Sequence, residues 1–491
     1  MARELIRVGA GYAPRWCENA DFWRWEKVKN VRDEPWRPIL KDGDKPIYIR
    51  IADAITDDIL AGRLAVGERL PPLRDLAGLL SLNYATISKA YNEAQRRGLI
   101  YSRVGQGSFV CRPGGISRRG ASADRAVDMT MNLPPESGNP LLRERMEAGL
   151  RALGPDLQPL MRYQGFGGSA EDKAAAVAWL QRRPLTIDVD RVLVCPGVQS
   201  ALLAVLGSLA RPGDVVVCEA LTYPGLRAIA GQLGIRLIGL PLDQDGIDPD
   251  DLARLCAEHR PKALYCNPVL LNPAVVTLSE ERRQRLVQVA RRYSLPIIED
   301  DAYGLLPTHR PTALAALAPE LTYYLCGFSK SLGAGLRIAY LVLPSARLKS
   351  RLAVTLRATT VMASPVTAAL ASCWVQDGTA DLAVSLTRKE SQLRQALVNE
   401  NLSGADYQTH PEAFHVWLRM PGPWSRVAFA ARMRAQGINV VVSDAFAVNG
   451  KPPEAVRLCL GGPISRQDLA HALHLIADTL DQPGAASAGF F

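Results

Sequence analysis

The chain has 491 residues, of which 48% are hydrophobic and 22% are charged, a composition typical of globular domains and unlike that of disordered or fibrous chains. At this length we expect roughly two to four domains. The net charge of +9 permits a nucleic-acid partner without requiring one. Nine scattered cysteines and the lack of an apolar N-terminal stretch favour a cytoplasmic protein with reduced thiols, no metal site and no membrane partner.

The N-terminal part of the chain predicts a small helical domain that follows an extension. Residues 1–44 contain four tryptophans among charged residues without a sustained period, and we assign them no function. Between residues 45 and 62, isoleucines at every fourth position predict an amphipathic helix. Pro71-Pro72 predicts the start of a second helix and Asn83 the N-cap of a third. Residues 99–110 alternate around a Gly-Gln-Gly turn and predict a hairpin wing.

Positive charge is concentrated in and beside this domain. From Ser81 to Arg119 there are seven positive residues and one negative residue, a net charge of +6. Three segments resemble the GntR-type DNA-binding domain: Arg-Leu-Pro-Pro-Leu-Arg-Asp-Leu-Ala, Asn-Tyr-Ala-Thr-Ile-Ser-Lys-Ala-Tyr and Gly-Gln-Gly-Ser-Phe-Val. The resemblance implies a winged helix-turn-helix over residues 45–112 that binds double-stranded DNA.

The same resemblance implies that Arg74 and the start of the third helix face DNA. We expect that helix to enter the major groove. Lys89 and Arg103 are expected to contact phosphates and to supply salt-dependent affinity. The expected DNA-binding residues are Arg74, Tyr84, Ala85, Thr86, Ser88, Lys89, Arg103, Gly105, Gln106 and Gly107, the last three at the tip of the wing.

Residues 113–127 are rich in Gly, Ser, Ala and Arg and predict a flexible linker. From residue 128 to residue 483 the chain alternates short apolar runs with helical patterns, and a tail follows at 484–491. This alternation predicts an α/β domain with a mainly parallel sheet, whose functional groups gather at the carboxyl ends of the strands. The apolar runs are Val192–Cys195, Val215–Cys218, Ala263–Cys266 and Pro296–Glu299.

Lys330 follows a strand-like run and lies seven residues before Arg337, among glycines and serines. A buried amine can form a Schiff base with an aldehyde, and a guanidinium can hold a phosphate with a planar set of donors. Together they indicate pyridoxal phosphate (PLP). At another strand end, a glycine turn leads into a helix whose first amides, at Val198 and Gln199, are suited to hold the phosphate.

Further polar and aromatic residues follow other predicted strands. Asp300 can keep a pyridine nitrogen protonated, which lets the ring withdraw electrons from a carbanion. Tyr303 and Asn272 can form hydrogen bonds with the ring hydroxyl, and Tyr223 can stack on the ring.

In this order, the motifs resemble fold-type-I aminotransferases over residues 128–482, and in detail the branch fused to GntR-type domains, the MocR group of regulators. The resemblance implies a homodimer with Lys330 as the catalytic Schiff-base lysine and Arg457 as the ligand of a substrate carboxylate. Tyr163 matches the tyrosine that reaches the phosphate bound by the partner subunit. The implied phosphate ligands within one subunit are Val198, Gln199, Ser329 and Arg337.

We therefore predict a PLP-dependent transcriptional regulator that senses an amino compound by aldimine exchange at Lys330. Two alternatives stay open: a working aminotransferase with an accessory DNA-binding domain, and a vestigial domain that only dimerises. The sequence departs from the aminotransferase pattern at Val275, where glycine is usual, and at Gly327, where serine or threonine is usual. Any transamination is therefore expected to be weak.

Overall fold

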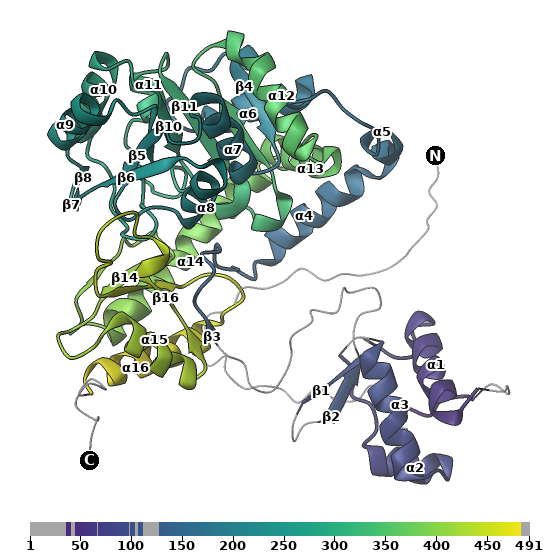
Figure 1. The fold of residues 1–491 in the computed structure, drawn as a ribbon. Coiled ribbons are helices and arrows are strands. Elements are labelled where there is room, and N and C mark those ends of the chain that lie inside the picture. The colour runs from purple at the N-terminus through teal and green to yellow at the C-terminus, as the bar shows by residue number, and fades with distance from the viewer. Residues whose placement is uncertain are drawn as a thin grey trace, which may run out of the picture. The chain divides into compact units, whose positions relative to one another are not determined.

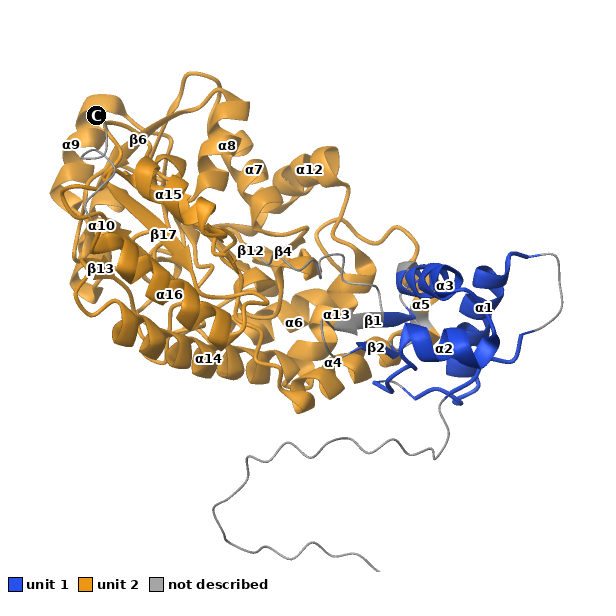
Figure 2. Cartoon of the chain, turned by 90° about the horizontal axis from the view of Figure 1, so that it is seen from below, with its two compact units in different colours: residues 1–122 blue, residues 123–491 orange. Residues whose placement is uncertain are grey.

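The computed structural model describes residues 36–40, 45–65, 67–97, 99–103, 107–110 and 127–482. The chain divides into two compact units, residues 1–122 and 123–491 (Figure 2). Most of the predicted extension, the predicted linker up to residue 126, the wing tip at Gly105 and Gln106, and the tail lie outside the described residues.

The first unit is a winged helix-turn-helix, as the sequence predicts (Figure 1). The predicted N-cap is confirmed, because Asn83 Oδ1 accepts a hydrogen bond from the amide of Ala85 at 2.8 Å. Tyr91 on the third helix donates to the carbonyl of Pro71 at 2.8 Å, which ties that helix to the start of the second. The elements are helices α1 (Ile47–Leu60), α2 (Leu73–Leu80) and α3 (Tyr84–Arg96), and the antiparallel strands β1 (Ile100–Arg103) and β2 (Gly107–Val110).

The core of this unit also contains a residue from the N-terminal extension. Trp36 is 5% exposed, and its indole N–H donates to Asp58 Oδ2 at 2.7 Å. Arg63 pairs with the other oxygen of the same carboxylate at 2.6 Å. A buried carboxylate needs such hydrogen-bond partners. Trp36 is therefore held in the core both by its hydrogen bond to Asp58 and by the burial of its apolar ring.

A seven-stranded sheet organises the second unit. Its strand order is β4-β12-β11-β10-β9-β5-β6, and only β12 runs antiparallel to its neighbours, which confirms the predicted mainly parallel sheet. All four predicted apolar runs are strands of this sheet. The strands are β4 (Val192–Cys195), β5 (Val215–Glu219), β6 (Arg236–Leu240), β9 (Ala263–Cys266), β10 (Ile297–Asp300), β11 (Thr322–Gly327) and β12 (Ala339–Val342).

Helices cover both faces of this sheet, which explains why its strands are continuously apolar. Leu193 and Cys195 pack with α7, α8 and α12, whereas Val192 and Val194 pack with α6 and α13 on the opposite face. The helices of the sheet layer are α6 (Ala170–Leu180), α7 (Val198–Leu209), α8 (Pro224–Leu233), α9 (Pro249–His259), α10 (Glu280–Arg292), α11 (Leu314–Leu317), α12 (Lys349–Thr360) and α13 (Pro365–Gln376).

A smaller four-stranded sheet forms the C-terminal part of the unit, in the order β13-β14-β17-β16. No helix in the described ranges is long and apolar enough to cross a membrane. The remaining elements are β3 (Val127–Asp128), α4 (Pro140–Ala152), α5 (Leu157–Leu160), β7 (Leu242–Asp243), β8 (Gly246–Ile247), α14 (Thr379–Asn401), β13 (Tyr407–Gln408), β14 (His415–Arg419), α15 (Arg426–Ala435), β15 (Ile438–Asn439), β16 (Val441–Val442), β17 (Ala455–Cys459) and α16 (Arg466–Leu480).

Candidate functional site

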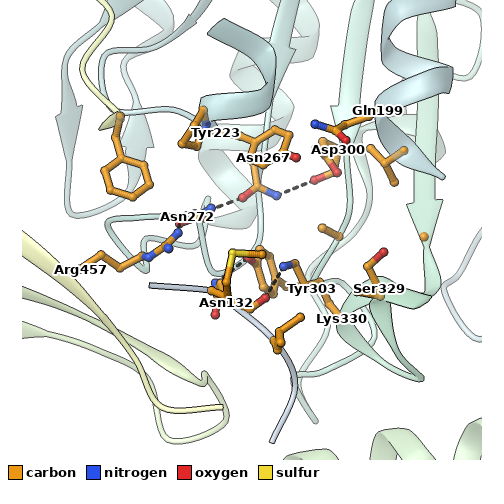
Figure 3. A pocket seen from close by; sticks show the side chains of 18 of the residues that line it. Asn132, Gln199, Tyr223, Asn267, Asn272, Asp300, Tyr303, Ser329, Lys330 and Arg457 are labelled. Carbon is orange, nitrogen blue, oxygen red and sulfur yellow. Dashed lines mark hydrogen bonds between the residues drawn. The ribbon is translucent and has the colours of Figure 1, made fainter. Parts of the chain in front are cut away.

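A cavity of about 490 Å³ lies at the carboxyl ends of the central strands, between them and the smaller sheet (Figure 3). Because parallel strands end at one edge of a sheet, residues from distant motifs meet there. The cavity is lined by ten of the predicted site residues: Val198, Gln199, Tyr223, Asn272, Asp300, Tyr303, Ser329, Lys330, Arg337 and Arg457.

Lys330 ends a short turn, Phe328–Lys330, that follows β11. The turn is anchored by Phe328, whose buried ring packs against Trp179 and Tyr340 at centroid distances of 5.2 and 5.3 Å. The lysine amine points into the cavity and donates a hydrogen bond to the carbonyl of Asn132. Burial lowers the pKa of Lys330 to about 8, so a usable fraction of the amine is neutral near neutral pH.

Asp300 ends strand β10 and is 4% exposed. Its Oδ2 accepts a hydrogen bond from the hydroxyl of Tyr265 at 2.8 Å, while its Oδ1 has no partner among the described residues. Burial raises the pKa of Asp300 to about 6, and the nearby Lys330 opposes that rise. An unpaired buried carboxylate oxygen is costly, so Oδ1 is suited to a ligand that brings an N–H donor.

The other end of the cavity is suited to an anion. Gly197 precedes helix α7 with a φ of 86°, and a Cβ there would lie 2.8 Å from Nη2 of Arg337. The guanidinium therefore lies against the helix N-terminus, where the first amides have no partner within the helix. Amides, helix dipole and guanidinium together are suited to an anion such as a phosphate, and Ser329 lines the same cavity.

Arg457 on β17 approaches from the smaller sheet. Its Nη1 donates to Asn272 Oδ1 at 2.7 Å, its Nη2 donates to the carbonyl of Thr130, and its guanidinium carbon lies 4.9 Å from the ring centre of Phe446. The structure thus pairs Asn272 with Arg457. The hydroxyl of Tyr303 accepts a hydrogen bond from Asn132 Nδ2 at 2.8 Å.

The sequence motifs missed part of the site. Asn132 contacts both Lys330 and Tyr303, and Asn267 Nδ2 donates to the backbone carbonyl of Asp300 at 2.6 Å. Asn267 lies directly after strand β9 and five residues before Asn272, so its position at a strand end was the signal that could have indicated it. Asn132 precedes the first strand of the large sheet and carries no comparable signal.

Tyr163 is the predicted cofactor residue that the structure places elsewhere. It lies in the loop after α5, is 81% exposed and does not line the cavity. Such exposure is what a residue that acts in another subunit requires.

The predicted DNA-binding residues lie mostly on the surface of the first unit. Arg74, Tyr84, Ala85 and Lys89 are exposed, and Thr86 and Ser88 are half-buried. Arg103 ends β1 and Gly107 begins β2. The exposed side chain of Arg69, which the sequence motifs did not single out, also lies beside the wing, because a Cβ on Gly107 would lie 2.9 Å from its Nε.

Comparisons with known proteins agree with this division. Residues 126–476 match the family described as aminotransferase class I and II. The chain belongs to this family. Residues 47–110 match the family of bacterial regulatory proteins called gntR, so the predicted MocR-type architecture is confirmed.

Two relatives named as regulators match this chain over different lengths. This family member is 30% identical over 450 residues to YdeF of Bacillus subtilis, named an uncharacterized HTH-type transcriptional regulator, covering 91% of this chain and 97% of YdeF. It is 25% identical over 332 residues to MocR of Rhizobium meliloti, named a probable rhizopine catabolism regulatory protein, covering 62% of this chain and 66% of MocR.

A solved structure shows the fold of the second unit. The α-aminoadipate aminotransferase LysN of Thermus thermophilus, complexed with N-(5'-phosphopyridoxyl)-L-leucine, superimposes with a TM-score of 0.66 at 22% identity, covering 72% of this chain and 92% of LysN. At that identity the likeness establishes the fold alone.

Proposed function

We propose that the protein is a DNA-binding transcriptional regulator that holds PLP on Lys330 and uses it to sense an amino compound. The observation that carries the proposal is the union, in one chain, of a gntR-type winged helix with a cavity lined by Lys330, Asp300 and Arg337. The names of the relatives, which are regulators of the same architecture, support it.

The residues of the cavity fit PLP. Oδ1 of Asp300 lacks a partner among the described residues and suits a protonated ring nitrogen, and the cradle of Gly197 and Arg337 suits the phosphate. When bound, PLP supplies an aldehyde that can be passed from the Lys330 amine to the amine of a ligand. Asp300 would hold the ring nitrogen, and Tyr303 would meet the ring hydroxyl.

Sensing requires that the ligand bind one arrangement of the protein more tightly than another. Lys330 and Arg457 donate to the carbonyls of Asn132 and Thr130, two residues apart on one segment. A ligand carboxylate competes with the Thr130 carbonyl and Asn272 for the Arg457 guanidinium. The segment continues directly from β3, which in sequence lies shortly after the boundary between the two units at residues 122 and 123. Occupancy of the cavity therefore acts on the chain that leads to the DNA-binding unit.

A second candidate is transamination. It is favoured by the pKa of Lys330, lowered to about 8 by burial, because a base that titrates near the working pH transfers protons well. Against it stand Val275 and Gly327, at positions where the aminotransferase pattern has glycine and serine or threonine.

A homodimer is part of the proposal. Large apolar side chains are exposed on α4, α5, the loop after α5 and α12, and the loop is tied to α12 by Arg357, which lies 4.4 Å from the ring centre of Phe166. A second copy of the chain would cover this face and receive Tyr163. The exposed side chains, here called the apolar face, are Leu141, Leu150, Leu157, Met161, Tyr163, Phe166, Val354 and Val361.

Replacing Lys330 by alanine should abolish covalent capture of PLP, because no other amine donates into the cavity from the described residues. The wild-type chain incubated with PLP should gain a visible absorption band that survives desalting, and Lys330→Ala should not gain it. Lys389→Ala, at an exposed lysine on α14, is the matched control and should keep the band. A desalted wild type without the band would contradict PLP binding.

Replacing Lys89 by alanine should weaken binding of the full chain to duplex DNA about equally across sequences. The salt dependence of log affinity should flatten by about one unit, because one phosphate contact is lost. Fluorescence anisotropy against the protein's own promoter region measures both effects. Lys45→Ala, on the same unit but paired with Asp53, should leave the slope unchanged. Equal slopes for wild type and Lys89→Ala would remove Lys89 from the interface.

Placing a charge on the apolar face should dissociate the dimer, because a carboxylate would lose its hydration on association. Sedimentation velocity should show a wild-type dimer and a monomer-dominated Met161→Glu variant; Met161 is 73% exposed in the single chain. Val427→Glu, at an exposed valine on α15 outside that face, is the matched control and should stay dimeric. The face is not the interface if both variants sediment as the wild type does.

A further inference from the structure

Asn132 contacts two of the groups that we assign to the cofactor, although no motif marks it. It is 6% exposed. Its carbonyl accepts a hydrogen bond from the Lys330 amine, and its side-chain Nδ2 donates to the hydroxyl of Tyr303 at 2.8 Å (Figure 3). Its Oδ1 is buried and has no partner among the described residues.

The backbone on both sides of Asn132 is fixed. Met129 donates to the carbonyl of Asn439 at 2.9 Å and accepts from the amide of Cys459 at 3.0 Å. Pro134, on the other side, accepts from the amide of Gly462 at 3.1 Å. These anchors lie outside the cavity and hold the segment that carries Asn132 against the smaller sheet and the loop that follows β17.

The contact with Asn132 sets the direction of the Tyr303 hydroxyl. An amide N–H can only donate, so the oxygen of Tyr303 accepts, and its proton stays available to another acceptor. Burial raises the pKa of Tyr303 well above its ordinary value, so the hydroxyl keeps that proton at physiological pH. Tyr303 therefore presents a donor to the cavity.

The other contact of Asn132 gives the Lys330 amine a neutral acceptor. Condensation with an aldehyde needs the uncharged amine, so an anionic acceptor at this place would slow it by favouring the ammonium form. The titratable and charged groups that face Lys330 are Asp300 and Tyr303 from the end of β10, His415 on β14, and Arg457 and Cys459 on β17.

We propose that Asn132 is a positioning residue for cofactor capture: its side chain turns Tyr303 into a hydrogen-bond donor, and its backbone carbonyl holds the Lys330 amine without placing a charge beside it. The proposal rests on the proposed function, since the captured group is PLP. It assigns to Asn132 one effect that depends on the chemistry of its side-chain amide, the direction of the Tyr303 hydroxyl. The contact with Lys330 comes from the backbone carbonyl, which any residue at this position keeps.

Asn132→Asp separates this effect from packing, because aspartate has nearly the shape of asparagine. A carboxylate can only accept, so it would take the Tyr303 proton away from the cavity, and its charge would raise the pKa of the Lys330 amine. We expect Asn132→Ala to weaken PLP binding about fivefold, the equivalent of one hydrogen bond. We expect Asn132→Asp to weaken it more than Asn132→Ala does.

The measurement is the rate at which the full chain gains the PLP absorption band, from pH 6 to pH 10. The wild type should reach half its maximal rate near pH 8, where the Lys330 amine titrates. The midpoint for Asn132→Asp should lie about one pH unit higher. Asn139→Asp is the matched control, because Asn139 caps α4 outside the cavity and aspartate caps a helix equally well.

An Asn132→Asp variant that binds PLP better than Asn132→Ala, with the wild-type midpoint, would overturn the inference and leave the proposed function intact. A midpoint shift in Asn139→Asp as large as that in Asn132→Asp would likewise overturn the inference and leave the proposed function intact. A wild type that captures no PLP at any pH would overturn both. Should Asn132→Asp fail to fold, the variants Asn132→Ala and Tyr303→Phe decide. The proposal expects the double variant to lose much less PLP affinity than the product of the two single losses. Independent losses would overturn it.

Discussion

The burial of one amine, that of Lys330, is the constraint around which the second unit is arranged. An ammonium group is costly to remove from water, so a lysine in a cavity needs acceptors, and its pKa falls. The carbonyl of Asn132 supplies the acceptor. Burial lowers the pKa of the amine to about 8, and Asp300 across the cavity opposes that fall. The edge of the buried sheet holds Asp300 and Lys330 in place, because Asp300 ends one of its strands and Lys330 ends the turn that follows another.

The residues of the candidate site that follow strands could be predicted from the sequence. Lys330 and Asp300 each end a short apolar run or the turn after it, and parallel strands bring such positions to one edge. Asn132 was not predictable, because its contacts with Tyr303 and Lys330 join residues 171 and 198 positions apart. Trp36 was missed for a similar reason: nothing near it in sequence reveals the buried carboxylate of Asp58.

The two units divide the chemistry of the chain. The net positive charge near α3 and the wing serves a polyanion, whose attraction depends on salt and hardly on fold detail. The cavity of the second unit depends instead on individual atoms, such as the unpartnered Oδ1 of Asp300. Covalent capture of an amino compound changes few atoms, but Lys330 and Arg457 hold the segment that leads back toward the first unit. In the function that we propose, that segment links occupancy of the cavity to DNA affinity.

The affinity of the PLP-loaded full chain for its own promoter DNA, measured at fixed salt while a panel of amino acids is titrated in, tests this account most directly. The account predicts that at least one amino compound changes the affinity by about 5- to 150-fold, the usual range of coupling between two sites, and that Lys330→Ala abolishes the change. DNA affinity that is indifferent to every amino compound, in a chain that transfers their amino groups at ordinary enzyme rates, would contradict it and establish an aminotransferase instead.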